Sequence, residues 1–140
     1  MNKYTELKKI IADDISNFPF LFAFSDKQFK EGMEKLGLKE TDTKKLLRVG
    51  SGMFIRKTDK DLLMVMTDKH DKMRKEAMKD NMYLHQAFLY ELGNHEYGYT
   101  YDEEPSIEAV GLTVKEVDEN KRLTRIFVEA RTEFLISCED

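Results

Sequence analysis

Apolar side chains recur at steps of three and four residues along most of this 140-residue chain, and this spacing constrains its fold more than any other feature. Residues so spaced lie on one face of an α-helix, and that face must be buried against another element. Capping boxes, at Ser25 with Gln28 and at Thr113 with Glu116, mark the beginning of two helices. The pattern predicts helices over residues 2–18, 25–36, 58–80, 82–93, 105–110 and 113–134.

Two parts of the chain favour β-structure instead. Residues 20–24, with the sequence FLFAF, form a continuous apolar run that we interpret as a buried strand or extended segment. Its three phenylalanine rings are expected to fill the core rather than to stack nucleic-acid bases, because no basic residue lies among them. The runs 46–49 and 53–56 flank a Gly-Ser-Gly loop and predict a β-hairpin.

A glycine, Gly32, lies on the buried face of the predicted helix 25–36. Glycine weakens a helix there by about 1 kcal/mol relative to alanine, so we expect another element to pack closely against it. No internal repeat, low-complexity tract or glycine- and proline-rich linker divides the sequence. The chain is therefore expected to form a single globular domain, residues 1–140, of the mainly helical α+β class with a small antiparallel sheet.

The chain carries 27 acidic and 23 basic residues, which gives a formal net charge of −4. A protein that binds the phosphates of nucleic acid usually presents a basic excess on one face. Residues 56–79 interleave eight bases with five acids, as the solvated face of an ordinary helix does. Direct binding of nucleic acid is therefore not favoured, and an accessory protein that binds it through this helix is the third alternative.

The cysteine content and the apolar runs bear on the compartment. A single cysteine, Cys138, leaves no disulfide within the chain and suits a reducing environment. The first residues enter a charged amphipathic pattern without the apolar stretch of a signal peptide. The longest apolar run, residues 18–24, is far too short to span a bilayer. These observations predict a cytoplasmic protein with no membrane partner.

A polar pair stands on the apolar face of the predicted helix 82–93. Glu91 and His95 are four residues apart, so they are neighbours on a helix, and burial requires such a carboxylate and imidazole to be paired. One interpretation is a carboxylate-oriented histidine that acts as a catalytic base or a metal ligand. The other is a structural pair that satisfies the helix end and tethers the segment beyond it.

The histidines match no known metal motif, because an HExxH pattern needs a second histidine that the sequence lacks. We therefore expect no cofactor and no metal ion, and the weak candidates for metal ligands are His70, His85 and His95. If the chain is an enzyme, its candidate catalytic residues are His95 and Glu91.

Beyond this pair lies a tyrosine-rich loop, residues 96–102, in which tyrosines alternate with smaller residues. Tyrosine is favoured where one protein docks onto another, because it offers a flat apolar ring with a polar tip. Alternatively, the rings clamp the loop over the core through ring packing and hydroxyl hydrogen bonds, and the sequence supports both interpretations equally. The candidate binding residues are Tyr97, Tyr99, Tyr101, His95 and Glu96.

Three segments together resemble a known family: residues 22–29 (FAFSDKQF) with Gly32, residues 52–58 (GMFIRKT) and residues 90–100 (YELGNHEYGYT). Between about Tyr4 and Val117 the chain is similar to a family of small uncharacterised proteins from Gram-positive bacteria and their phages or mobile elements. That family has no assigned reaction, so the resemblance implies no catalytic residue. It implies a bacterial or phage cytoplasmic setting and an accessory or host-interaction role.

These observations favour a non-enzymatic protein-interaction or regulatory factor of phage or mobile-element type, whose expected partner is another protein. The main alternative is a small metal-assisted hydrolase, in which His95 and Glu91 act together with His85 or His70. The sequence predicts neither the reaction of such an enzyme nor the oligomeric state of the chain.

Overall fold

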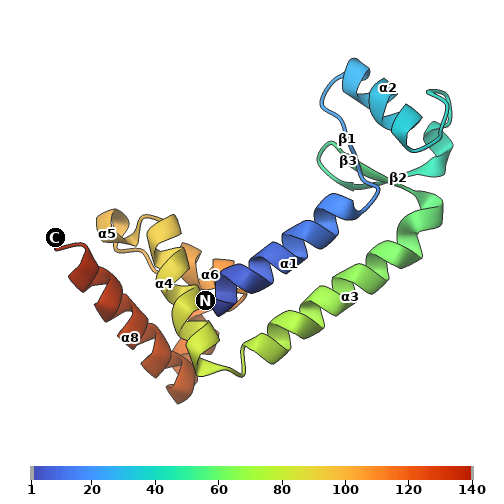
Figure 1. Cartoon of the computed structure of the whole chain (residues 1–140). Helices are drawn as coiled ribbons and strands as arrows, with labels where there is room; N and C mark the ends of the chain where they lie inside the picture. The colour runs from blue at the N-terminus through green and yellow to red at the C-terminus, as the bar shows by residue number, and fades with distance from the viewer. Residues whose placement is uncertain (1, 140) are drawn as a thin grey trace. The chain divides into compact units, whose positions relative to one another are not determined.

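The computed structural model describes residues 2–139 and confirms the mainly helical α+β class (Figure 1). The chain divides into two compact units, which are described separately. Of the described residues, unit 1 comprises 2–9 with 73–139, and unit 2 comprises 10–72. Two long helices, α1 (Lys3–Asn17) and α3 (Lys60–Ala77), contribute residues to both units. The expected organisation as a single domain stays a prediction.

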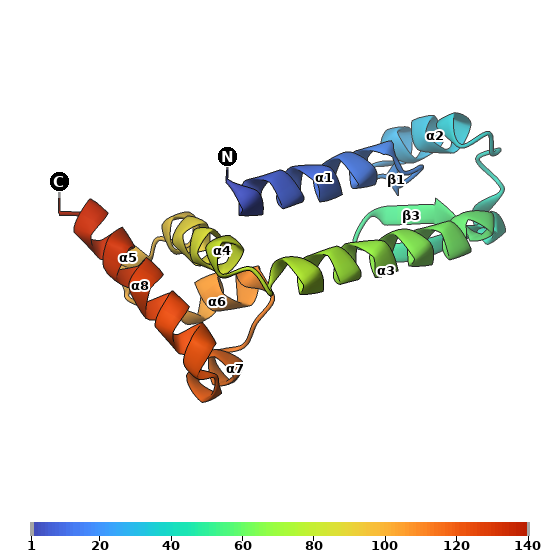
Figure 2. The same ribbon diagram turned by 60° about the horizontal axis from the view of Figure 1, so that its bottom comes forward.

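Unit 1 is built from helices around one central helix. In unit 1, α4 (Asn81–Asn94) packs against α6 (Glu104–Val110) and α8 (Lys121–Ser137) (Figure 2). A short helix, α7 (Val114–Glu119), lies between α6 and α8 in the sequence. A single helical turn, α5 (Tyr97–Thr100), follows α4. The local signals for these elements hold: the capping box at Thr113 opens α7, and Gly111 ends α6 with a φ of 98° that favours glycine.

The core of unit 1 forms on the predicted apolar face of α4. Leu84, Ala87, Phe88 and Leu92 are all fully buried. The ring of Phe88 meets the ring of Phe127 edge-on, with 5.2 Å between the centroids. Because the buried face continues to the last turn of α4, any polar side chain on that turn must also find partners.

Unit 2 contains the sheet and the helix that covers it. Its strands are β1 (Leu21–Phe22), β2 (Leu46–Gly50) and β3 (Met53–Arg56). All pairs are antiparallel, in the order β1-β3-β2, so the predicted hairpin is confirmed and β1 adds a third strand at one edge (Figure 1). Helix α2 (Asp26–Lys35) packs against β1 and begins at the predicted cap, where the Ser25 hydroxyl accepts a hydrogen bond from the amide of Gln28.

The expected close approach at Gly32 is also present. A methyl group added at Gly32 would lie 2.6 Å from Cγ of Leu21, a side chain that is 1% exposed. The strand therefore packs directly onto the backbone of α2, and only glycine leaves room for it. Together with Met33 and Leu36, Leu21 forms the small core of unit 2.

Three local expectations are wrong. Phe22 and Phe24 are 55% and 77% exposed, so they do not fill the core. The reason is that β1 is a two-residue edge strand, whose buried face is occupied by Leu21 alone. The helix predicted over residues 113–134 is instead two helices, α7 and α8, because Asn120 adopts an extended conformation that ends the first and caps the second. Finally, the expected loop 96–102 contains a helical turn, α5.

No helix in the described residues combines the length and the apolar character that crossing a bilayer requires.

Candidate functional site

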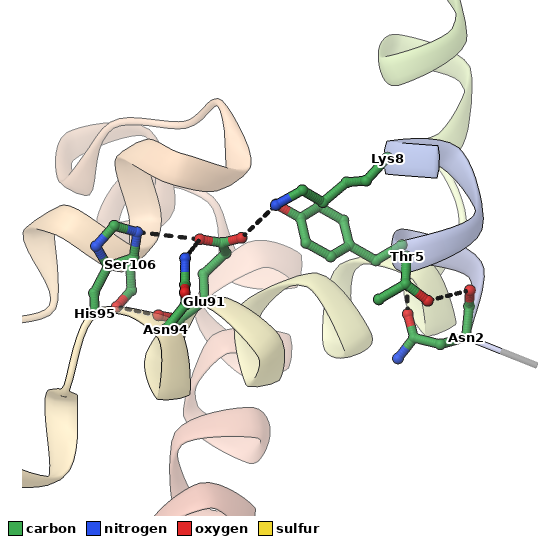
Figure 3. Close-up of polar contacts among 8 residues, drawn as sticks. Asn2, Thr5, Lys8, Glu91, Asn94, His95 and Ser106 are labelled. Atoms are coloured by element: carbon green, nitrogen blue, oxygen red, sulfur yellow. Dashed lines mark hydrogen bonds and ion pairs between the residues drawn. The ribbon is translucent and has the colours of Figure 1, made fainter. Parts of the chain in front are cut away.

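The most heavily bonded side chain of unit 1 is the carboxylate of Glu91, on the last turn of α4 (Figure 3). It is 2% exposed, and one oxygen accepts hydrogen bonds from the Tyr4 hydroxyl at 2.9 Å and from the Lys8 ammonium at 3.3 Å. The other oxygen lies 3.1 Å from Nε2 of His95 and 3.5 Å from the amide nitrogen of Asn94. The predicted pair of Glu91 and His95 is therefore in contact.

These donors decide the charge of the buried carboxyl. Burial alone raises the pKa of Glu91, but the hydrogen bonds from Tyr4 and Lys8 and the charge of Lys8 outweigh it and lower that pKa below 4.5. The same carboxylate, together with burial, raises the pKa of the Tyr4 hydroxyl far above its ordinary value of 10.0. Glu91 is thus an ionised anchor that binds the first turns of α1 to the end of α4, and Tyr4 is a permanent donor to it.

Further hydrogen bonds hold the backbone of the last turn of α4. The Ser106 hydroxyl of α6 is fully buried and donates to the backbone carbonyl of Glu91 at 3.2 Å (Figure 3). The backbone amide of His95, which ends α4, donates to the same carbonyl at 2.9 Å. Side chains from three helices therefore fix the point at which the chain leaves α4.

We call residues 96–102, which follow this point, the tyrosine turn. Its helical turn α5 is bounded by two residues in the left-handed conformation, Glu96 with a φ of 56° and Tyr101 with a φ of 54°. Few non-glycine residues adopt this conformation, and each case costs about 1 kcal/mol or more. Such a backbone persists only where its surroundings hold it in place.

The three tyrosines of the turn differ in burial. Tyr97 is 6% exposed and packs against Phe134 and Tyr101, so this candidate binding residue anchors the turn in the core. The rings of Tyr99 and Tyr101 are 89% and 67% exposed. One ring therefore clamps the turn over the core, two rings remain at the surface, and docking through those two rings stays a prediction.

The charged side chains in the chain segment that contains the tyrosine turn are all acidic. Residues 96–114 contain five acids and no lysine or arginine. A hydrogen bond with Glu108 and the charges of Glu108 and Asp102 raise the pKa of Glu104, which shows that these carboxylates repel one another. One of the five, Glu103, is paired with Arg131 at 3.3 Å. The exposed rings therefore lie in a chain segment of excess negative charge.

The three histidines have separate carboxylate partners. Nε2 of His70 in unit 2 lies 2.8 Å from Asp14, and His85 and His95 in unit 1 pair with Glu133 and Glu91. Among residues 2–139, no three histidine, cysteine or acidic side chains gather as a metal ion would require. The joint action of His95 and Glu91 with a second histidine, on which the hydrolase alternative depends, thus has no support in the geometry.

Tyr4 and Lys8, the two donors from α1, are not predicted from the sequence. The signal for Tyr4 was its place on the apolar face of the first helix, because a buried tyrosine needs a partner for its hydroxyl. Nothing in the sequence connected Lys8 with an acid 83 residues away. The hydrogen-bonding need of Glu91 was foreseeable, whereas the identity of its donors was a matter of tertiary packing.

Comparison with known proteins gives a family but no activity. No curated protein matches the chain. No solved structure matches it either. Residues 3–133 match a family of unknown function, DUF7659, which agrees with the resemblance to an uncharacterised family, and the chain belongs to this family.

Proposed function

We propose that the chain is a non-enzymatic interaction factor, that the tyrosine turn is its docking surface, and that its partner is a protein with a positively charged segment. The observation that carries the proposal is the exposure of Tyr99 and Tyr101 on a backbone bounded by two left-handed residues. Strained backbone of this kind is found preferentially at functional sites. Rigid, exposed tyrosines also lose little conformational entropy on binding, which is why they dominate many interfaces.

The charge of the turn supports a basic partner. Arginine and lysine bind over tyrosine rings through cation–π contacts, worth about 0.5–1 kcal/mol at exposed sites. Glu104 lies close enough to Glu108 and Asp102 for their negative charges to repel one another, and the same cations would relieve that repulsion. An acidic partner would meet like charges instead.

The buried anchor gives the turn its fixed position. Glu91 accepts hydrogen bonds from α1 and contacts His95 at the end of α4, which orients the histidine. The buried ring of Tyr97 anchors the tyrosine turn in the core. In this proposal Glu91 and His95 position the surface, and the rings of Tyr99 and Tyr101 contact the partner. The catalytic interpretation of the pair is not needed, because the carboxylate already has donors on both oxygens.

We also propose that the protein acts in the cytoplasm of bacteria or of cells infected by their phages. The resemblance to proteins of Gram-positive bacteria and their mobile elements supports a bacterial or phage origin and a regulatory role. The single cysteine of the chain suits a reducing cytoplasm.

A site-specific crosslink tests the docking surface. A photoreactive phenylalanine analogue replaces Tyr99 or, as the control in the same unit, the 57% exposed Met82, and each protein is irradiated in a bacterial lysate. We expect a discrete crosslinked partner from position 99 only. The purified partner should then bind Tyr99→Ala about tenfold or more weakly, and Met82→Ala as well as the original protein. Equal crosslinking from both positions, or unchanged affinity of Tyr99→Ala, would contradict the proposal.

A further inference from the structure

The hairpin of unit 2 carries the densest positive charge in the chain. Residues 43–60, which include β2 and β3, contain six basic residues and one acid, Asp59. That acid is buried and accepts a hydrogen bond from Nε of Arg56 at 2.7 Å, so it neutralises the one base that is not exposed. The five exposed bases are Lys44, Lys45, Arg48, Lys57 and Lys60. We call residues 43–60 the basic hairpin.

Most of these exposed charges are uncompensated. Lys45 has a loose ion pair with Asp42 at 3.9 Å, whereas no salt bridge is formed by Lys44, Lys57 or Lys60 within residues 2–139. The side chain of Arg48 folds along its own strand, and its Nε donates to the carbonyl of Gly50 at 3.2 Å. The basic hairpin therefore differs from the helix that follows it, in which acids and bases alternate.

Two exposed aromatic rings lie at the turn of the basic hairpin. Phe22 pairs in register with Met53, the first residue of β3. Phe24 packs against the turn itself, because a methyl group added at Gly52 would lie 2.6 Å from its ring, and the neighbouring amide of Ala23 donates to the Gly52 carbonyl at 2.8 Å. The ring of Phe24 nevertheless remains 77% exposed. The sheet thus brings exposed aromatic rings, from a stretch without bases, to the turn end of the basic hairpin, whereas its exposed lysines lie at the opposite end of the two strands.

We propose that the basic hairpin, with Phe22 and Phe24, binds single-stranded nucleic acid. Proteins that hold single strands combine a positive surface along the phosphates with aromatic rings on which bases stack. Both parts are present here, with the rings at the turn of the basic hairpin and the lysines at its other end, about four strand residues or roughly 13 Å away, a span that an extended single strand of a few nucleotides can cover. A duplex would use the charges but not the rings, because its bases are already stacked. A segment made of acidic residues alone would likewise leave the two exposed phenylalanines without a partner.

The test measures binding of the full chain to labelled oligonucleotides by fluorescence anisotropy. Probes are oligothymidine and oligouridine of about 20 nucleotides, a duplex of equal length, and a polyglutamate peptide of similar charge. We expect the single strands to bind more tightly than the duplex and the peptide. Replacing Phe24 by alanine should weaken that binding about tenfold. The control Leu62→Ala, which removes an apolar side chain 61% exposed in the same unit, should have no effect.

A matched lysine pair separates the hairpin from the helix. Lys44→Gln removes an exposed base of the basic hairpin, and Lys72→Gln removes one from α3 in the same unit. Lys44→Gln should lower the slope of log K against log salt by about 0.7, the value for one lost phosphate contact, and Lys72→Gln should leave it unchanged. Unfolding curves of each variant show that the fold is retained.

Three results would overturn the proposal. One is the absence of single-strand binding at about 50 mM salt, where phosphate contacts are strong. Another is binding of polyglutamate or the duplex as tight as that of the single strands, which would indicate a purely electrostatic surface. The third is an equal loss of binding in Lys44→Gln and Lys72→Gln. None of these outcomes affects the docking proposal for the tyrosine turn, which concerns residues of unit 1.

Discussion

The two units divide apolar burial and charge very unequally. Of the 19 apolar side chains buried among the described residues, 14 belong to unit 1 and 5 to unit 2. By sequence, unit 1 carries 16 acids against 11 bases, and unit 2 carries 11 acids against 12 bases. Unit 1 thus gathers its buried apolar residues in one core and leaves six large ones exposed among the described residues. Unit 2 leaves seven large apolar residues exposed around a small core. Because unit 1 buries far more apolar residues, hydrophobic burial should stabilise it more than unit 2, whose exposed apolar residues surround a much smaller core.

Replacing one phenylalanine by alanine in each unit tests this difference in burial most directly. Phe88→Ala removes a fully buried ring that packs on Phe127, and it should lower the free energy of unfolding by about 3–5 kcal/mol. Phe24→Ala removes a ring that is mostly in water, and it should change stability by no more than about 0.5 kcal/mol. Urea unfolding followed by circular dichroism measures both. A large loss in Phe24→Ala would show that the ring is buried in solution.

Removing the negative charge of the buried Glu91 should have the next largest effect on the free energy of unfolding. In Glu91→Gln the negative charge that Tyr4 and Lys8 bind is lost, and we expect a cost of about 2 kcal/mol at neutral pH. Because folding lowers the pKa of Glu91 below 4.5, its contribution is complete above that pH and is lost as the pH falls through the folded value. As the pH falls below about 4.5, the original protein should therefore lose stability more steeply than Glu91→Gln.

Two controls belong to this experiment. Glu96→Gln changes an acid for which no buried partner is present, and it should leave the neutral stability nearly unchanged. Parallel pH profiles of the original protein and Glu91→Gln would show that the carboxylate is not held in its ionised form by its neighbours.

Contacts between residues close together in the sequence could be predicted, whereas contacts between distant residues could not. The contact of Glu91 with His95 spans one helical turn, and the hairpin depends on a local glycine loop, so both were predictable. The donors Tyr4 and Lys8 come from the other end of unit 1 in the sequence, and no local pattern identifies them. The different fates of the tyrosine rings, and the exposure of the phenylalanines, depend on packing that periodicity alone does not specify.

The positive surface of unit 2 likewise could not be predicted from the sequence. Counting charge over residues 56–79 follows one helix and finds both signs mixed. The sheet instead unites residues 43–60 with Phe22 and Phe24, which the chain supplies from a separate strand. A surface assembled from two strands is invisible to any single sequence window, so the binding site proposed here required the register of the sheet.

The smallest expected effect concerns the packing that unit 2 does have. Gly32→Ala places a methyl group 2.6 Å from Cγ of Leu21, a side chain with no room to move, so the strain should exceed the roughly 1 kcal/mol by which alanine favours the helix. We expect a net loss of about 1 kcal/mol, measured by urea unfolding. The double variant Gly32→Ala with Leu21→Ala relieves the clash, so it should be more stable than the sum of the two single losses predicts. Additive losses would mean that β1 does not rest on the backbone of α2, and the small core of unit 2 would then need a different explanation.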